Sequence, residues 1–199
     1  MNDLYNYPLD FKFKIATFSN DFVATDAQGQ TLLYAREKIF TWRDVVKVYS
    51  DTTKNNLRYT LRSNRLIDFQ QTFTISDAQG VELGKVRRKS IKSLWRSTFE
   101  LRNIQGEHDF TIREKSVWTK FLDSLFGEIP IIGGLSGYVF NPAYIVQDNQ
   151  GVPYFEIKKM PSFFGRRFQV HKLIPQEVAQ EERLLLSMVM LVLLERSNG

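Results

Sequence analysis

The chain has 199 residues, a formal net charge of +5 and no cysteine. Its length allows one large domain or two small ones, and the lack of cysteine excludes disulfides and thiolate metal sites. The moderate basic bias is compatible with an anionic partner, such as a lipid surface or a nucleic acid, and equally with an ordinary solvated surface.

The N-terminal sequence MNDLYNYPLDFKFK lacks the positive segment followed by an apolar segment that marks a signal peptide. No apolar run reaches the ~20 residues that a transmembrane helix needs. We therefore expect a cytoplasmic protein without a transmembrane segment, one that could still bind peripherally to a membrane.

Four segments align without gaps around a glycine that has Gln directly before it and Asp or Asn three residues before it. Asp or Asn opens a turn by bonding its own backbone, and Gly accepts a positive φ angle without steric cost. Apolar and polar residues alternate on both sides, which predicts β-hairpins with one buried face. The four glycines are Gly29, Gly80, Gly106 and Gly151.

The alternation assigns side chains to the two faces of each predicted hairpin. We expect the inner face after each glycine to carry Leu33, Ala35, Gly84, Val86, Phe110, Ile112, Phe155 and Ile157. We expect the outer face to carry Thr25, Tyr34, Ser76, Lys85, Arg102, Thr111, Gln147 and Glu156.

The spacing of the glycines predicts further strands. Gly80 and Gly106 are 26 residues apart, which we take as one unit, and Gly29 and Gly80 are 51 residues apart, nearly two units. A fifth hairpin should therefore lie near residue 55, where Asn in DTTKNN would replace Gly in the left-handed conformation. An insertion at 116–137, which begins as a short amphipathic helix, interrupts the unit before Gly151. Strands at 11–15 and 166–174 bring the hairpin region 11–174 to about twelve strands.

The C-terminal segment 176–196 predicts a buried helix. Every residue from Leu184 to Leu194 except Ser187 is apolar, and a helix that is apolar all round is usually buried. Pro175 fits the first turn of such a helix. We predict a mainly β fold, a closed antiparallel barrel around a central C-terminal helix. The alternative is a two-sheet sandwich with the helix packed outside.

The D-x-Q-G hairpins, the opening YPLDFKFKI and the terminal apolar helix resemble the LURP-one-related family over nearly the whole chain. That family is grouped with the tubby C-terminal domain and the phospholipid scramblases, which share a twelve-stranded barrel around a hydrophobic helix. The resemblance implies a single domain over residues 1–199. It implies little chemistry, although tubby domains bind phosphoinositides through basic surface residues.

A basic residue follows each glycine by seven positions, on the expected outer face. These residues would form a basic rim that suits anionic lipid headgroups or phosphate backbones; the alternative is a solvated strand-end surface. The rim residues are Arg36, Arg87, Arg113 and Lys158, with Arg88, Lys89, Lys92, Arg96, Arg166 and Arg167 nearby. The candidate interfacial apolar residues are Trp95, Trp118, Phe163 and Phe164, each of which could instead pack on the barrel mouth.

Catalytic signals are weak. His108 and His171 lie far apart without a partner at ligand spacing, and the adjacent Glu181 and Glu182 do not share a helix face. We expect no catalytic residue, metal or cofactor, and we interpret the chain as a non-catalytic binding module for anionic phospholipids or an acidic protein. The alternatives are a structural or lipid-carrier protein related to scramblases, an enzyme that uses only carboxylates, and, less favoured, a nucleic-acid-binding protein.

Overall fold

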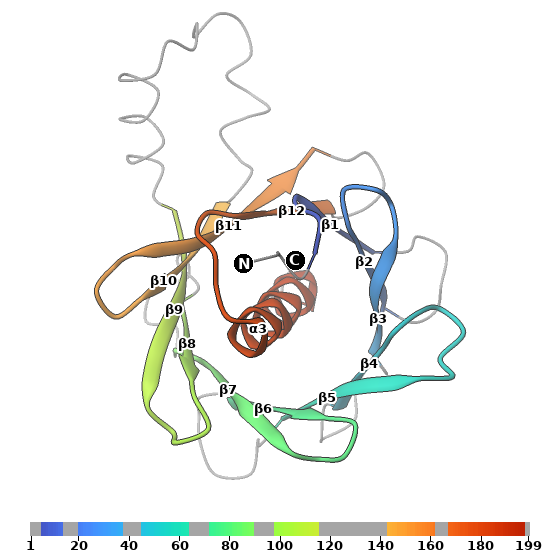
Figure 1. Cartoon of the computed structure of the whole chain (residues 1–199), viewed down its shortest axis with the longest axis horizontal. Helices are drawn as coiled ribbons and strands as arrows, with labels where there is room; N and C mark the ends of the chain where they lie inside the picture. Colours follow the sequence, from blue (N-terminus) through green and yellow to red (C-terminus); the bar gives the residue numbers. More distant parts are fainter. Residues whose placement is uncertain are drawn as a thin grey trace, which may run out of the picture.

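The computed structural model describes residues 5–13, 20–37, 45–63, 72–89, 98–115, 143–161 and 167–197. These residues form twelve antiparallel strands and one helix, and β12 pairs with β1 so that the sheet closes into a barrel (Figure 1). The strands are β1 Leu9–Phe13, β2 Asn20–Thr25, β3 Thr31–Glu37, β4 Val45–Tyr49, β5 Leu57–Ser63, β6 Thr72–Asp77, β7 Glu82–Arg88, β8 Thr98–Arg102, β9 His108–Glu114, β10 Ala143–Asp148, β11 Pro153–Met160 and β12 Arg167–Lys172, and the helix is α3 Val178–Ser197.

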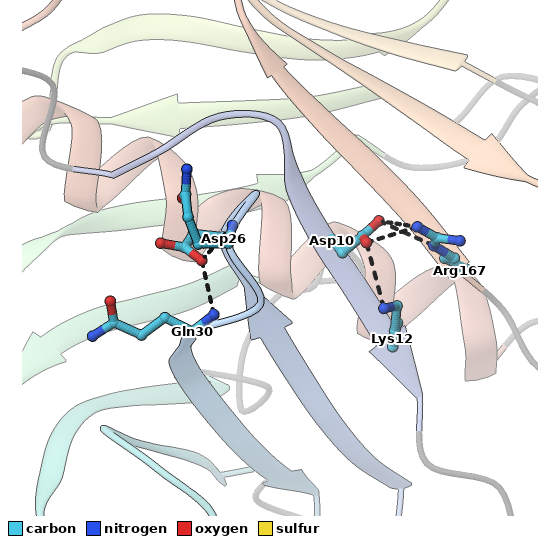
Figure 2. Close-up of polar contacts among 6 residues, drawn as sticks. Asp10, Lys12, Asp26, Gln30 and Arg167 are labelled. Carbon is cyan, nitrogen blue, oxygen red and sulfur yellow. Dashed lines mark hydrogen bonds and ion pairs between the residues drawn. The ribbon is translucent and has the colours of Figure 1, made fainter.

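The predicted hairpin turns are confirmed at all four glycines, and they share one turn chemistry. Asp26 Oδ1 accepts hydrogen bonds from the backbone N–H groups of Gln28 and Gln30 at 3.0 and 2.8 Å (Figure 2). The Gly29 N–H donates to the Asp26 carbonyl at 3.0 Å, and Gly29 has a φ of 81°. Side-chain oxygens at the equivalent positions accept backbone N–H groups in the other turns: Asp77, Asn103 and Asp148.

The fifth hairpin is also confirmed, because β4 and β5 pair through a turn at 50–56. The expectation that an Asn takes the left-handed conformation in this turn is wrong. Lys54 takes it, with a φ of 63°. Its Nζ atom lies 5.7 Å from the centre of the Tyr34 ring, a cation–π contact that offsets part of the backbone strain.

The helix lies inside the ring of strands, as predicted, and the sandwich alternative is wrong (Figure 1). Every side chain from Leu184 to Leu194 is at most 7% exposed. The hydroxyl of Ser187, the one polar side chain of this run, donates to the Arg183 carbonyl at 2.8 Å. The predicted inner-face residues of the hairpins are all buried against the same core.

Some predicted boundaries differ from the structure. The helix begins at Val178 rather than at 176, and its first backbone bond runs from the Glu181 N–H to the Glu177 carbonyl. Pro175 therefore lies in the connection before the helix, not in its first turn. The predicted insertion at 116–137 lies outside the described residues.

Each of the five hairpins has a β-bulge next to its turn, where the register shifts by one residue. A bulge leaves one residue of a strand without a partner on the neighbouring strand and changes the direction of its side chain. The unpaired residues are Leu32, Arg58, Leu83, Asp109 and Tyr154. The three apolar ones pack against the core, and the two charged ones contact the helix. We call this end of the barrel, with turns at 26–30, 50–56, 77–82, 103–109 and 148–153, the glycine-turn end.

Candidate functional site: a basic ring at one end of the barrel

Six basic side chains mark the barrel end opposite the glycine turns. The odd-numbered strands run toward this end, and each carries an outward-facing Lys or Arg within its last three residues. We call this set the strand-end ring. It comprises Lys12, Arg36, Arg62, Arg87, Arg113 and Lys158. Neighbouring strands lie ~4.8 Å apart, so basic residues on alternate strands recur about every 10 Å around the barrel.

The sequence identified four of these six residues, and the structure adds Lys12 and Arg62. The glycine repeat missed them because β1 has no glycine turn before it and the turn before β5 has no glycine. Alternation along each strand was the usable signal, since both residues lie between two buried neighbours.

Carboxylates near the ring hold several of its side chains in place. Arg36 Nε lies 3.7 Å from Asp21 Oδ1, and Lys158 Nζ lies 3.1 Å from Glu156 Oε2. Both basic side chains remain 47% exposed. Exposed ion pairs of this kind contribute little to stability, so the charges of Arg36 and Lys158 remain available at the surface.

Arg167 joins the two strands that close the barrel. Its guanidinium donates to both carboxylate oxygens of Asp10, at 2.8 and 2.7 Å, and Lys12 Nζ lies 3.4 Å from Oδ2 of the same carboxylate (Figure 2). Burial alone would raise the pKa of Asp10, but the hydrogen bonds from Arg167 and the charge of Lys12 hold it below its ordinary value. Arg167 is therefore part of the β1–β12 seam as well as a candidate contact residue.

The structure separates the three basic residues of the RRK run. Arg87 faces outward in the ring, whereas Arg88 pairs with Phe99 in the register and lies 6.0 Å from the centre of its ring. Lys89 Nζ lies 2.7 Å from Glu100, and this hydrogen bond lowers the pKa of the Glu100 carboxyl. The other predicted site residues lie outside the described residues: Lys92, Arg96, Arg166, Trp95, Trp118, Phe163 and Phe164.

The glycine-turn end has the opposite charge. In the five turns and the bulges next to them, acidic residues outnumber the two basic ones, Lys54 and Arg58. The acidic residues are Asp26, Asp51, Asp77, Glu82, Glu107, Asp109 and Asp148. The barrel is therefore electrically polarised along its axis, with a basic ring at one end and acidic turns at the other.

One buried and two partly exposed ion pairs fix the start of α3 at the glycine-turn end. Lys172 Nζ lies 2.7 Å from Glu181 Oε2, and the hydroxyl of Tyr7 donates to Glu181 Oε1 at 2.7 Å. Lys172 and Glu181 side chains are only 6% and 1% exposed. The bulge residues complete the arrangement: Arg183 donates to Asp109 at 3.1 Å, and Arg58 lies 3.4 Å from Glu182.

The sequence did not predict these contacts, because Tyr7, Arg58 and Asp109 lie far from the helix in the chain. The one available signal was the charged run Glu181, Glu182 and Arg183 directly before a wholly apolar helix. Glu181, Glu182 and Arg183 each tie the helix to another part of the barrel, which makes them structural residues.

A family model described as LURP-one-related matches residues 31–128, a segment that runs from β3 to beyond β9. The chain belongs to the LURP-one-related family. None of the curated proteins matches the chain. The matched segment of this LURP-one-related chain contains four ring residues: Arg36, Arg62, Arg87 and Arg113.

One predicted outer-face residue of this LURP-one-related protein is buried. Tyr34 was expected to face solvent, but its side chain is only 2% exposed. Burial and the hydrogen bond to Asp21 raise the pKa of Tyr34 to about 12. The prediction failed because alternation assigns a side chain to a face of the strand but does not show what covers that face. Here Lys54 of the β4–β5 turn lies over the Tyr34 ring.

The two histidines have polar neighbours on their own strands. His108 Nε2 lies 3.0 Å from Thr111 Oγ1, and His171 Nε2 lies 3.1 Å from Gln169 Oε1. Burial and the nearby charge of Lys158 lower the pKa of His171. In the described part of the chain, no group of three or more His, Cys, Asp and Glu residues is placed to hold a metal ion. Among the described residues, no helix combines the length and apolar character needed to cross a membrane.

Proposed function

We propose that this LURP-one-related protein is a non-catalytic binding module that docks on an anionic phospholipid surface through its strand-end ring. The observation that supports this function best is the charge polarity of the barrel. A basic ring surrounds one end, while the turns at the other end are acidic. An anionic surface attracts the first end and repels the second, so the same field binds the molecule and orients it.

The expected affinity follows from the ring charges. Each Lys or Arg near an anionic bilayer contributes about 1 kcal/mol, and the attraction decays within a Debye length, about 10 Å at 0.1 M salt. Asp21 and Glu156 partly screen Arg36 and Lys158. The binding should therefore be reversible and strongly dependent on salt. In this proposal Trp95, Trp118, Phe163 and Phe164 supply the apolar anchors.

The enclosed helix argues against the carrier alternative. The side chains from Leu184 to Leu194 occupy the barrel interior, which is the space that an enclosed acyl chain would need. A docking role needs only the outer surface and leaves this core intact.

Vesicle co-sedimentation tests the proposal. Full-length protein should pellet with phosphatidylcholine–phosphatidylserine vesicles, not with phosphatidylcholine alone, and should be released when NaCl rises from about 0.05 to about 0.5 M. The variant Arg62→Glu/Arg113→Glu should bind at least about tenfold more weakly. The control Lys54→Glu/Lys85→Glu makes the same charge change nearer the glycine-turn end and should bind like the wild type.

Circular dichroism melts would establish that both variants remain folded. Equal loss of binding in the ring variant and the control would show that only net charge matters, and this would contradict docking through the ring. Binding that persists at high salt or on neutral vesicles would contradict it as well.

A further inference from the structure

The glycine-turn end carries exposed apolar side chains as well as acidic ones. Among the described residues, the large hydrophobic side chains that are exposed all lie at this end, at 39–63% exposure. They are Val81, Ile104, Val152, Leu173 and Val178. Three lie in hairpin turns, and the other two lie where β12 leads into α3.

These residues lie along the part of this end that runs from β6 to β12. Asn149 in the β10–β11 turn donates to the His108 carbonyl at the start of β9, which joins two neighbouring turns. The Leu173 N–H donates to the Tyr154 carbonyl at 2.9 Å, which joins the β12–α3 connection to β11. The β6–β7 turn, with Val81, comes next in the barrel order after β8. We call this surface, from the β6–β7 turn to Val178, the acidic–apolar arc.

Carboxylates lie among the apolar residues of the arc. They are Asp77, Glu82, Glu107, Asp148 and Glu177. Asp77 and Asp148 accept backbone N–H groups within their turns, and Glu82 lies 3.3 Å from Lys85. Glu107 and Glu177 are both exposed, and the Glu107 carboxylate also accepts a hydrogen bond from the Asn103 amide at 3.1 Å. Exposed apolar residues with an acidic surround are the features of a protein-binding surface for a basic partner.

We propose that the acidic–apolar arc binds a cationic amphipathic segment of a partner protein, one that interleaves Lys or Arg with apolar residues. The apolar side chains of the segment would pack against Val152, Leu173 and Val178, and its cations would face Glu107 and Glu177. An anionic lipid surface is repelled by these carboxylates. The strand-end ring of a second copy carries complementary charge, but its six members are all Lys or Arg and offer no apolar side chain for Val152, Leu173 and Val178.

The arc and the strand-end ring lie at opposite ends of the barrel, so both can be occupied at the same time. The protein would then link an anionic surface to a cationic partner. The arc does not depend on the proposed membrane docking, and each can fail without the other.

Fluorescence anisotropy with defined peptides tests the arc. A labelled peptide that interleaves Lys with Leu should bind the full chain at least about tenfold more tightly than a Lys–Ser peptide or a Glu–Leu peptide. Glu107→Lys/Glu177→Lys and Leu173→Ser/Val178→Ser should each weaken binding of the Lys–Leu peptide at least about tenfold. Asp51→Lys places a charge reversal in the β4–β5 turn outside the arc and should leave binding unchanged.

Three results would overturn the inference. The first is equal affinity for the three peptides, which would mean that binding does not require both apolar and cationic side chains in the peptide. The second is unchanged binding in folded arc variants, because the peptide would then bind elsewhere. The third is concentration-dependent self-association in sedimentation velocity that the arc variants abolish, because a second copy would then be the occupant.

Discussion

Gly84 and Arg183 approach each other so closely that a side chain on residue 84 would collide with the helix. A Cβ atom on Gly84 would lie 2.9 Å from Arg183 Cδ and 2.5 Å from the carbonyl oxygen of Arg102. Gly84 faces inward on β7, and Arg183 continues past it to Asp109. The missing side chain at position 84 thus makes room for the residue that anchors the start of α3.

Gly84→Ala should destabilise the protein by more than about 3 kcal/mol. The substitution adds a Cβ clash with backbone and a strained conformation, because Gly84 has a φ of 147°. Urea unfolding at neutral pH measures the change. Gly80→Ala is the matched control, since Gly80 has a φ of 87° and open space around its Cβ position. The control should cost only about 1–2 kcal/mol, and equal costs would show that helix packing does not constrain residue 84.

Lys172→Met should cost about 3–5 kcal/mol, because it leaves Glu181 buried without its cation. Lys172→Met/Glu181→Leu should be more stable than Lys172→Met alone, since the second substitution removes the uncompensated charge. Chemical denaturation of the wild type, both single variants and the double variant forms a double-mutant cycle. Additive losses would contradict a coupled ion pair.

The hairpins and the central helix could be predicted because their signals are local. Asp26 and Gly29 encode a turn within four residues, and the helix from Leu184 to Leu194 is marked by composition alone. The bulges are marked only weakly in the sequence, by the adjacent apolar pairs Leu32–Leu33 and Tyr154–Phe155 that interrupt the alternation. A pattern of period two gives no rule for where a strand inserts an extra residue.

The candidate site was only partly predictable, because it depends on register between strands. Asp10 and Arg167 meet only once β1 pairs with β12. Lys172 and Glu181 meet only once the helix enters the barrel. Local spacing identified Arg36 and its three counterparts as outward-facing, but it could not show which carboxylates lie beside them.

The stability of the wild type should fall in strong alkali through Tyr34. Its pKa is raised to about 12 in the folded state, against an ordinary value near 10. A raised pKa contributes stability that is fully present below pH ~10 and is lost as pH rises through about 12. Unfolding free energies from pH 9 to 12.5 should decline more steeply for the wild type than for Tyr34→Phe, by on the order of 2 kcal/mol. Parallel profiles for the two proteins would contradict the assignment.

Met188→Asp should unfold the protein, because it places an unpaired charge where the side chain is fully buried. The cost is comparable to the whole stability of a typical domain, about 5–15 kcal/mol. Met188→Leu keeps the volume and apolar character and should cost less than about 1.5 kcal/mol. Far-ultraviolet circular dichroism and thermal melts measure both variants. A folded Met188→Asp protein of native stability would show that the helix does not fill the barrel.

The order of the elements along the chain imposes an order on assembly. The helix follows all twelve described strands in the sequence, yet it lies within the closed ring that they form (Figure 1). During synthesis the apolar faces of the early hairpins therefore have no partner until the last element is made. If β1 and β12 joined first, they would shut the helix out, so closing the seam and enclosing the helix must occur together. The Asp10–Arg167 ion pair across β1 and β12 should therefore form in the same step that encloses the helix.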